Sequence, residues 1–269
     1  MAFLQVTYYS QALRMNVPVN VILPEPPKEA PETSDSKEIS YRTLYLFHGN
    51  GGNHSVWMRR TAIERYAAEY GIAVVMPEVG RNWYTDTCYG ANYFTFVTEE
   101  LPSVCCHYFR GINHKRENNL VAGFSMGGYG ALKAALTYPE KYCACASLSG
   151  ALDITRKRPE IDMREWRGIF DFNMKDSKEL EGSIHDIYML ARRNKEHGQV
   201  FPKLYLWCGT EDDLIGNNRE FHGLLEKLQV EHCYEESEGD HSWKWWDMHI
   251  QDALHCLLDE KRETGDRGK

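Results

Sequence analysis

The chain has 269 residues and a composition ordinary for a globular protein, with 42% hydrophobic and 26% charged residues. Its formal net charge of −8 comes from 39 acidic and 31 basic residues spread along the sequence, without the basic stripe typical of binding to nucleic acid or an anionic membrane. No apolar run approaches the length of a membrane span. We therefore expect a small-molecule partner, and neither nucleic acid nor a membrane.

The N-terminus and the cysteines indicate the compartment. Residues 1–8 have neither a charged n-region nor an apolar h-region, so no signal peptide is predicted. The eight cysteines are then expected to be reduced and mostly buried thiols of a cytoplasmic protein. Their spacings and those of the eleven histidines do not match a zinc site, so no metal is predicted.

The predicted elements begin with a hairpin and continue as an alternation of strands and helices. Residues 3–13 and 17–23 alternate apolar and polar side chains, as in an antiparallel hairpin at a sheet edge, and a loop rich in Pro and Glu follows from 24 to 38. This alternation predicts one α/β domain over 1–269, with a mostly parallel central sheet, an antiparallel N-terminal edge and helices on both faces. The predicted parallel strands are 43–47, 72–76, 119–124, 142–148 and 203–208, and the predicted helices are 56–70, 93–108, 128–138, 217–228 and 243–258.

The segment 151–201 interrupts this alternation. It contains clustered aromatic and charged residues and a charged helical stretch near 184–195. A cap-like insertion that shapes a pocket and an excursion packed away from the site both fit this pattern. The tail 261–269 is polar, and we expect it to be frayed.

The most informative motif is a serine between two glycines. Ser125 lies in the pattern G-x-S-x-G, after the apolar run 120–122 and before the helix-forming stretch 131–136. On so sharp a turn the side chains two residues to either side of the serine would collide, which accounts for Gly123 and Gly127. The pattern predicts a nucleophile elbow, and a purely structural tight turn is the alternative.

A serine nucleophile needs a base, and the base needs an acid that orients it. In the α/β-hydrolase order both lie downstream, the acid first. Glu211, Asp212 and Asp213 follow the fifth apolar run, and Asp212 is preferred, with Asp213 in reserve and Glu211 the least favoured. An acidic cap on the next helix is the alternative for each of them. His241 lies on a glycine-containing loop before the last predicted helix and is the candidate base.

An oxyanion hole is expected from two backbone amides. The residue after the nucleophile, Met126, supplies one N–H. The glycine-rich loop after the first parallel strand supplies the other, with Asn50 the first choice, Gly51 the next and His48 as a buttress of the loop. This loop lacks both G-x-G-x-x-G and the P-loop lysine, so nucleotide binding is discounted and no cofactor is predicted.

With these parts in order, the chain resembles the tributyrin esterase family of α/β-hydrolases and, more distantly, S-formylglutathione hydrolases and feruloyl and acetyl-xylan esterase domains. The resemblance extends through most of the chain and is far more specific than G-x-S-x-G alone. It is carried by Tyr8-Tyr9-Ser10, Leu46-Phe47-His48-Gly49, Trp83-Tyr84-Thr85-Asp86-Thr87, Glu99-Glu100-Leu101-Pro102, the elbow, Trp207-Cys208-Gly209 and Gly239-Asp240-His241-Ser242-Trp243.

The resemblance implies the roles of the site residues. Ser125 would be the nucleophile, Asp212 the acid and His241 the base, with the amides of Asn50 and Met126 as oxyanion donors.

It also draws attention to the loop of Trp83 and Tyr84, which would lie beside the acyl pocket with Gly51. Either aromatic ring would contact the substrate, or the two would only pack the loop. The segment 151–201 is the least family-like part of the chain.

The expected function is that of a cytoplasmic serine carboxylesterase that hydrolyses short-chain acyl esters through an acyl-enzyme. Three alternatives stay open: a thioesterase acting on S-formylglutathione or an esterase of the feruloyl and acetyl-xylan type, an acyltransferase, and a non-catalytic binding protein on the same scaffold. Related esterases are often assemblies, so a homo-oligomer is a further partner to consider.

Overall fold

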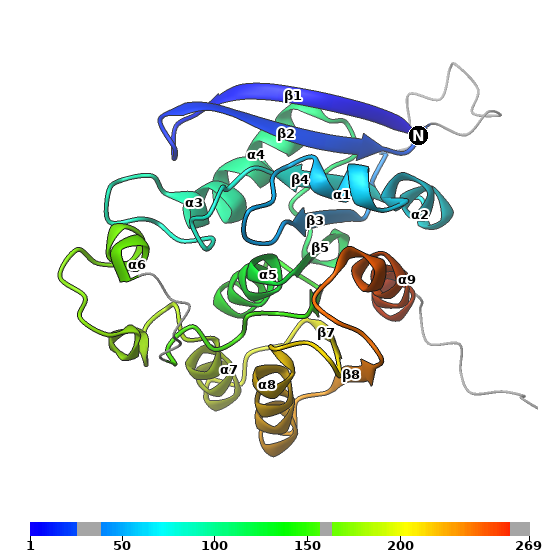
Figure 1. Cartoon of the computed structure of the whole chain (residues 1–269). Helices are drawn as coiled ribbons and strands as arrows, with labels where there is room; N and C mark the ends of the chain where they lie inside the picture. The colour runs from blue at the N-terminus through cyan, green and yellow to red at the C-terminus, as the bar shows by residue number, and fades with distance from the viewer. Residues whose placement is uncertain (26–38, 157–162, 259–269) are drawn as a thin grey trace, which may run out of the picture.

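A single twisted sheet organises the computed structural model, which describes residues 1–25, 39–156 and 163–258 (Figure 1). Its eight strands have the order β1-β2-β4-β3-β5-β6-β7-β8. Most of the predicted Pro-rich loop and the predicted frayed tail lie outside the described residues. The strands are β1 (Ala2–Ser10), β2 (Met15–Leu23), β3 (Thr43–Phe47), β4 (Ala73–Pro77), β5 (Asn119–Phe124), β6 (Ala144–Leu148), β7 (Lys203–Gly209) and β8 (His232–Ser237).

The strand directions confirm the predicted α/β-hydrolase fold. β1 and β2 form an antiparallel hairpin, β2 joins β4 in antiparallel fashion, and all the remaining neighbours are parallel. Each residue of β3, β4, β5 and β6 is buried, because helices cover both faces of these strands. This burial explains why they are continuous apolar runs in the sequence, whereas the edge strands β1 and β8 alternate in exposure.

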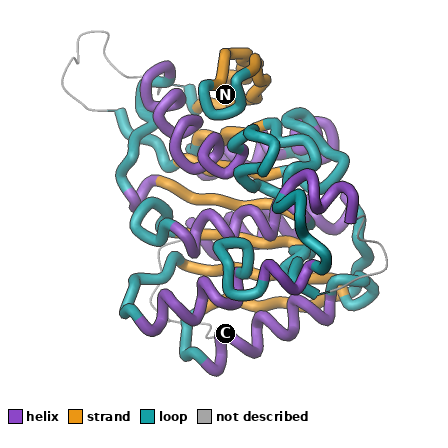
Figure 2. The backbone as a smooth tube through the Cα atoms, turned by 90° about the vertical axis from the view of Figure 1, so that its left-hand side faces the viewer, coloured by secondary structure: helices purple, strands orange, loops and turns teal. Residues whose placement is uncertain are grey.

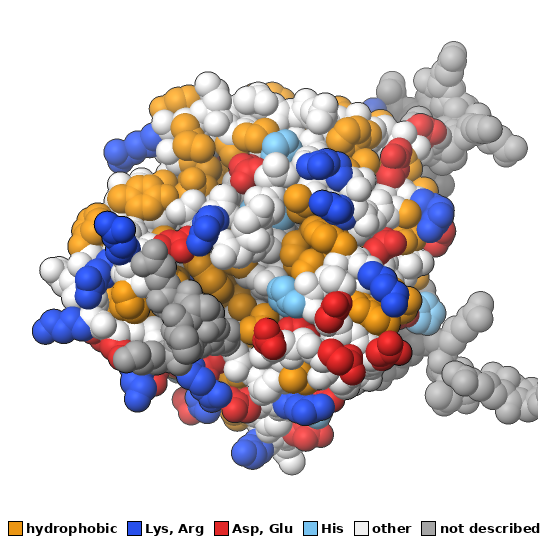
Figure 3. Space-filling model, in the orientation of Figure 1, with side chains coloured by type: hydrophobic (Ala, Val, Ile, Leu, Met, Phe, Trp, Pro, Cys, Tyr) orange, Lys and Arg blue, Asp and Glu red, His pale blue; other side chains and the backbone are white. Residues whose placement is uncertain are grey.

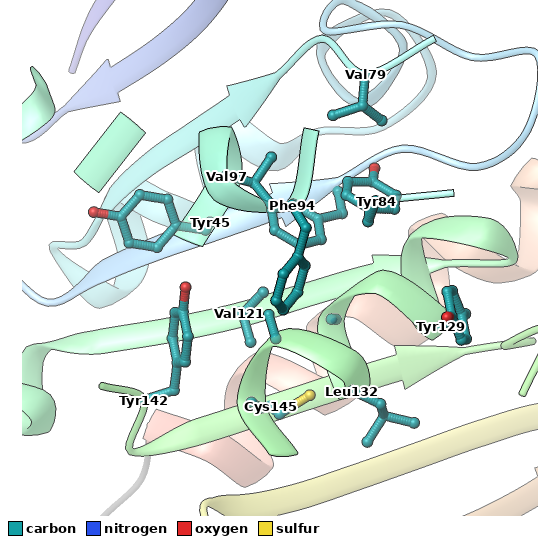
Figure 4. Packing of buried hydrophobic residues seen from close by; sticks show 14 of the residues in the cluster. Tyr45, Val79, Tyr84, Phe94, Val97, Val121, Tyr129, Leu132, Tyr142 and Cys145 are labelled. Atoms are coloured by element: carbon teal, nitrogen blue, oxygen red, sulfur yellow. The ribbon is translucent and has the colours of Figure 1, made fainter. Parts of the chain in front are cut away.

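Helices cover the two faces of the sheet and lie to its left and right in Figure 1, and Figure 2 looks from the left onto one of the two layers. Successive residues of β3 point to opposite faces: Leu44 and Leu46 pack in a core cluster with α1, α2 and α9, while Tyr45 and Phe47 pack in another with α4, α5, α7 and α8 (Figure 4). The helices are α1 (Val56–Arg60), α2 (Ile63–Tyr70), α3 (Tyr93–Thr95), α4 (Leu101–Tyr108), α5 (Met126–Thr137), α6 (Met163–Ile169), α7 (Ile187–Glu196), α8 (Ile215–Lys227) and α9 (Trp243–Leu258). No helix within the described ranges combines the length and apolar character that a membrane crossing needs.

Two predicted helices are interrupted. The stretch 56–70 is two helices, because Thr61 has an extended backbone and the Ala62 N–H donates to Asp247 Oδ1 of α9 at 3.2 Å. The stretch 93–108 contains a π-helical segment, Phe96–Glu100, between α3 and α4. The Thr98 carbonyl lies one turn before Pro102, which has no N–H to donate to it. Lys141 Nζ lies 3.4 Å from this carbonyl oxygen.

The segment 151–201 divides into two parts. Its last helix, α7, packs against α5 and α8 and so belongs to the layer that covers the sheet. The described residues before α7 hold α6 and a 3₁₀ turn, Ser177–Leu180. In α6, Trp166 contacts Trp83 with ring centroids 5.7 Å apart, so this part reaches the loop that the sequence places beside the pocket.

Candidate active site

Ser125 lies on a strained turn between β5 and α5. Its φ of 55° and ψ of −121° are unfavourable for any residue with a side chain. A Cβ on Gly123 would lie 2.4 Å from the Gly127 carbonyl oxygen, and one on Gly127 would lie 2.5 Å from the Phe47 oxygen. The close approach of these backbones explains why both positions beside the serine are glycine.

We expect Gly127→Ala to destabilise the protein by about 3 kcal/mol or more, since the clash is with backbone atoms that no rotamer change can move. Gly223→Ala in α8 is the matched control, because a Cβ there meets nothing within 4 Å. The control should gain about 0.5–1 kcal/mol from the helix propensity of alanine. Urea unfolding measures the stability of both variants, and equal unfolding midpoints for Gly127→Ala and Gly223→Ala would refute the steric explanation.

The structure brings together the three residues proposed as a triad. His241 Nε2 lies 3.0 Å from Ser125 Oγ, and His241 Nδ1 lies 2.8 Å from Asp212 Oδ2. His241 is on the loop between β8 and α9, and its side chain is 38% exposed, while the Asp212 carboxylate is fully buried. The Trp246 ring packs against the imidazole in a T-shaped arrangement at a centroid distance of 4.9 Å. The arrangement matches a nucleophile, a base and an orienting acid.

The three neighbouring carboxylates occupy different environments. Burial opposes ionisation of Asp212, but hydrogen bonds from His241, the Leu214 N–H and Ser149 outweigh it and hold the pKa of this carboxyl below its ordinary value. Asp213 is exposed. Glu211 accepts from the Gly239 N–H at 2.6 Å and so fastens the loop of Asp212 to the loop of His241.

Ser149 is a contributor that the sequence did not reveal. It follows β6 at a φ of 47°, its hydroxyl bonds to the Asp212 carboxylate, and its Oγ accepts from the indole N–H of Trp246 at 3.2 Å. It therefore connects the acid to α9. A serine after a buried strand has no motif of its own, so the sequence offered no signal for it.

The glycine-rich loop after β3 is held by His48. The Val79 N–H donates to His48 Nε2 at 3.2 Å, so the ring proton is on Nδ1, which donates to the Gly49 carbonyl at 2.9 Å. Burial lowers the pKa of His48, which keeps the ring neutral. A second donor to the Gly49 oxygen is the Gly52 N–H at 3.0 Å. These bonds fix the peptide that carries the Asn50 N–H.

The two candidate oxyanion donors follow strands β3 and β5. Asn50 is exposed in the glycine-rich loop, and Met126 is the first residue of α5. Within the described residues neither backbone N–H has an acceptor. Gly51, the next residue after Asn50, is exposed at a φ of 74°.

The two aromatic residues considered for the pocket wall, Trp83 and Tyr84, differ in burial. Tyr84 is fully buried, so for this ring the loop-packing alternative fits the structure: the ring stacks on Phe47, and the hydroxyl donates to the His48 carbonyl at 2.8 Å. Trp83 is half-buried and packs against Tyr129 and Trp166.

One cluster of possible metal ligands occurs in the described residues, formed by Glu235, His249 and Asp252. His249 Nδ1 already bonds to Asp252 Oδ2 at 2.8 Å, and Tyr205 donates to Glu235 at 2.8 Å. Hydrogen bonds among protein groups therefore account for this cluster.

Comparisons with known proteins show the family of the chain. The Esterase family model matches residues 10–257. The chain belongs to the Esterase family. An acetyl esterase of Caldicellulosiruptor saccharolyticus is 34% identical over 96% of this chain and 98% of its own length. An S-formylglutathione hydrolase of Paracoccus denitrificans (strain Pd 1222) is 29% identical over 89% of this chain and 88% of its own.

Two solved structures are similar to nearly the whole chain. FphF, a fluorophosphonate-binding serine hydrolase of Staphylococcus aureus, is 31% identical with a TM-score of 0.87, covering 96% of this chain and 99% of that one. The S-formylglutathione hydrolase FrmB of the same organism is 30% identical with a TM-score of 0.83 and the same coverage. This member of the Esterase family is accordingly a serine hydrolase that acts on ester bonds.

Proposed function

We propose that the protein is a carboxylesterase that hydrolyses short-chain acyl esters through an acyl-enzyme on Ser125. The observation that carries the proposal is the unbroken set of hydrogen bonds from Ser125 Oγ through His241 to Asp212, at 3.0 Å and 2.8 Å. This geometry lets a neutral imidazole take the hydroxyl proton as the oxygen attacks a carbonyl carbon.

The reaction follows from the positions of these groups. Ser125 Oγ bonds to the acyl carbon while its proton passes to His241 Nε2, and the buried carboxylate of Asp212 stabilises the imidazolium. The tetrahedral intermediate collapses, and His241 gives the proton to the departing alcohol. Water then attacks the acyl-enzyme by the same route, which restores Ser125 and releases the acid. These steps need no cofactor.

The negative oxygen of the intermediate requires preorganised donors. The amides of Asn50 and Met126 are the proposed pair, and their orientation is supported by the bonds that His48 and Gly52 make to the Gly49 carbonyl. Met126 begins α5, so the positive end of that helix adds to the stabilisation.

The wall of the acyl pocket is the next part of the proposal. Trp83 is held between Tyr129 and Trp166, and we place it beside the acyl chain with Gly51. In this proposal the described residues before α7 act as a cap, because α6 supplies Trp166. The acetyl esterase name of one relative is consistent with a small acyl group.

Hydrolysis of S-formylglutathione is the second candidate, since two relatives carry that name. The charge around the site disfavours it. The loops that carry Asp212 and His241 also bear exposed carboxylates, at Glu211, Asp213, Glu238 and Asp240. Acidic side chains gather in Figure 3 over the region where Figure 1 places α8 and β8. Such a rim repels the two carboxylates of a glutathione thioester.

A substrate panel tests the proposal: p-nitrophenyl esters from acetate to dodecanoate, with methyl ferulate and S-formylglutathione. We expect kcat/KM to be highest for acetate to butyrate and at least about tenfold lower for dodecanoate, because one methylene changes pocket affinity by about 1 kcal/mol or more. Faster turnover of S-formylglutathione than of every ester would transfer the assignment to a thioesterase. Ester formation with added alcohols would indicate an acyltransferase.

We also propose that the protein is cytoplasmic. A further proposal is that it forms a homo-oligomer. All eight cysteines are free thiols in the structure, including Cys233 and Cys256, whose sulfur atoms lie 3.0 Å apart. Free thiols are typical of proteins in a reducing compartment. Size-exclusion chromatography with light scattering determines the oligomeric state.

A further inference from the structure

Lys133 is a buried lysine on the helix that follows the nucleophile elbow. Its side chain is 1% exposed, and Nζ donates to the Tyr84 carbonyl at 2.9 Å, to Thr85 Oγ1 at 3.0 Å and to His185 Nδ1 at 3.1 Å. The ammonium also lies 4.6 Å from the centre of the Phe94 ring. All three protons of Nζ thus have an acceptor.

A lysine at this position is costly to the fold. Burial lowers the pKa of Lys133 to about 7, and burial together with the nearby Lys133 lowers that of His185 to about 3, so His185 is neutral and its Nδ1 can accept. An apolar side chain would fill the same space in α5 without desolvating a charge. The use of all three protons indicates that the lysine holds its acceptors in place.

The main acceptor is the carbonyl of a strained residue. Trp83 and Tyr84 have φ values of 51° and 48°, a left-handed conformation that bulky side chains rarely adopt. The ring of Tyr84 lies against Gly130 of α5, where an added Cβ would come within 2.3 Å of it. Tyr84 is therefore seated on α5 by its ring at Gly130 and by its carbonyl at Lys133, in the same core cluster as Phe94 and Tyr129 (Figure 4).

From Tyr84 the contacts continue to the oxyanion loop. The Tyr84 hydroxyl donates to the His48 carbonyl at 2.8 Å, and His48 Nδ1 donates to the Gly49 carbonyl at 2.9 Å. The Gly49 carbonyl and the Asn50 N–H belong to one planar peptide, so fixing the carbonyl fixes the direction of the N–H. Hydrogen bonds thus connect α5 to the peptide of the proposed oxyanion donor through four residues, Lys133, Tyr84, His48 and Gly49.

We propose that Lys133 and Tyr84 are positioning residues for the oxyanion hole: Lys133 holds the strained Trp83–Tyr84 turn, and the Tyr84 hydroxyl holds the loop that presents the Asn50 amide. The inference rests on the proposed function, because it assumes that Asn50 binds the oxyanion. It assigns to Lys133 and Tyr84 no contact with substrate.

Two variants break these contacts at different points. Tyr84→Phe removes only the hydroxyl that reaches His48, and Lys133→Met removes the ammonium while keeping a long side chain. Loss of a whole oxyanion donor costs about 10²–10³ in kcat, so loss of its support should cost less, about 10-fold for Tyr84→Phe and about 30-fold for Lys133→Met, with KM nearly unchanged. Lys141→Met is the control, since that lysine is 38% exposed and lies over Tyr138.

Two further readouts distinguish positioning from a general structural role. The double variant should show about the same loss of kcat as Lys133→Met alone, because both changes act through one series of contacts. Affinity for a trifluoromethyl ketone, whose adduct on Ser125 places a negative oxygen in the oxyanion hole, should fall in proportion to kcat/KM. A structural role would lower the unfolding midpoint and leave the affinity of the folded protein unchanged.

The outcomes separate the two proposals. Wild-type protein without esterase activity would contradict the proposed function. If the wild-type protein is active and the kcat of Tyr84→Phe is within twofold of that of Lys141→Met, only the positioning inference is overturned. If Lys133→Met does not fold, Tyr84→Phe decides the question by itself, since it deletes one oxygen atom.

Discussion

Ser125→Ala should lower kcat for p-nitrophenyl acetate by about 10⁴-fold or more while the urea unfolding midpoint stays close to that of wild type. The substitution removes the nucleophilic oxygen and keeps the Cβ, so the strained turn between β5 and α5 has the same packing. Residual turnover would come from the oxyanion donors and from substrate binding. Stopped-flow or steady-state assays under matched protein concentrations measure the loss.

Ser147→Ala is the matched control for this experiment. Ser147 is fully buried on β6, and its hydroxyl has no hydrogen-bond partner in the part of the chain that the structure describes. The control should keep activity within about twofold. Ser125→Ala retaining activity within tenfold of wild type would remove Ser125 from the mechanism.

Asp212→Asn should reduce kcat by up to about 10⁴-fold, whereas Asp213→Asn should change it by less than about threefold. The amide preserves the shape of the Asp212 side chain, but it cannot stabilise the imidazolium of His241 and favours the wrong tautomer. Asp213 is exposed and next in sequence, which makes it a close control for charge and position.

Steady-state kinetics with both purified variants decides between the carboxylates. Equal and mild losses would mean that neither residue is the acid. A large loss in Asp213→Asn alone would exchange their roles.

Local sequence patterns predicted the parallel part of the sheet well. Four strands are buried throughout, so their sequences are unbroken apolar runs with little competing signal. Two helix interruptions were missed because their causes lie elsewhere in the chain. The break after α1 depends on Asp247 of α9, which is 185 residues from Ala62, and the π-helical segment before Pro102 lies beside Lys141.

The same distinction applies to the site. Ser125, Asp212 and His241 could be proposed as a triad because each follows a strand in an order that the fold imposes. The sequence left open whether Trp83 or Tyr84 contacts substrate or only packs the loop, because an aromatic residue in a loop has no sequence feature that separates a buried ring from an exposed one. Lys133 gave a weak signal, a single charge in an apolar helix, but its acceptor on His185 is 52 residues away.

Mass spectrometry after labelling with a fluorophosphonate tests the central claim most directly. We expect one phosphonyl group per chain, located on the peptide that contains Ser125, with loss of esterase activity in proportion to labelling. His241→Ala should slow the labelling strongly, because the serine then lacks its base. Fully labelled protein that still hydrolyses p-nitrophenyl acetate, or inactivation with the label on another residue, would contradict Ser125 as the nucleophile.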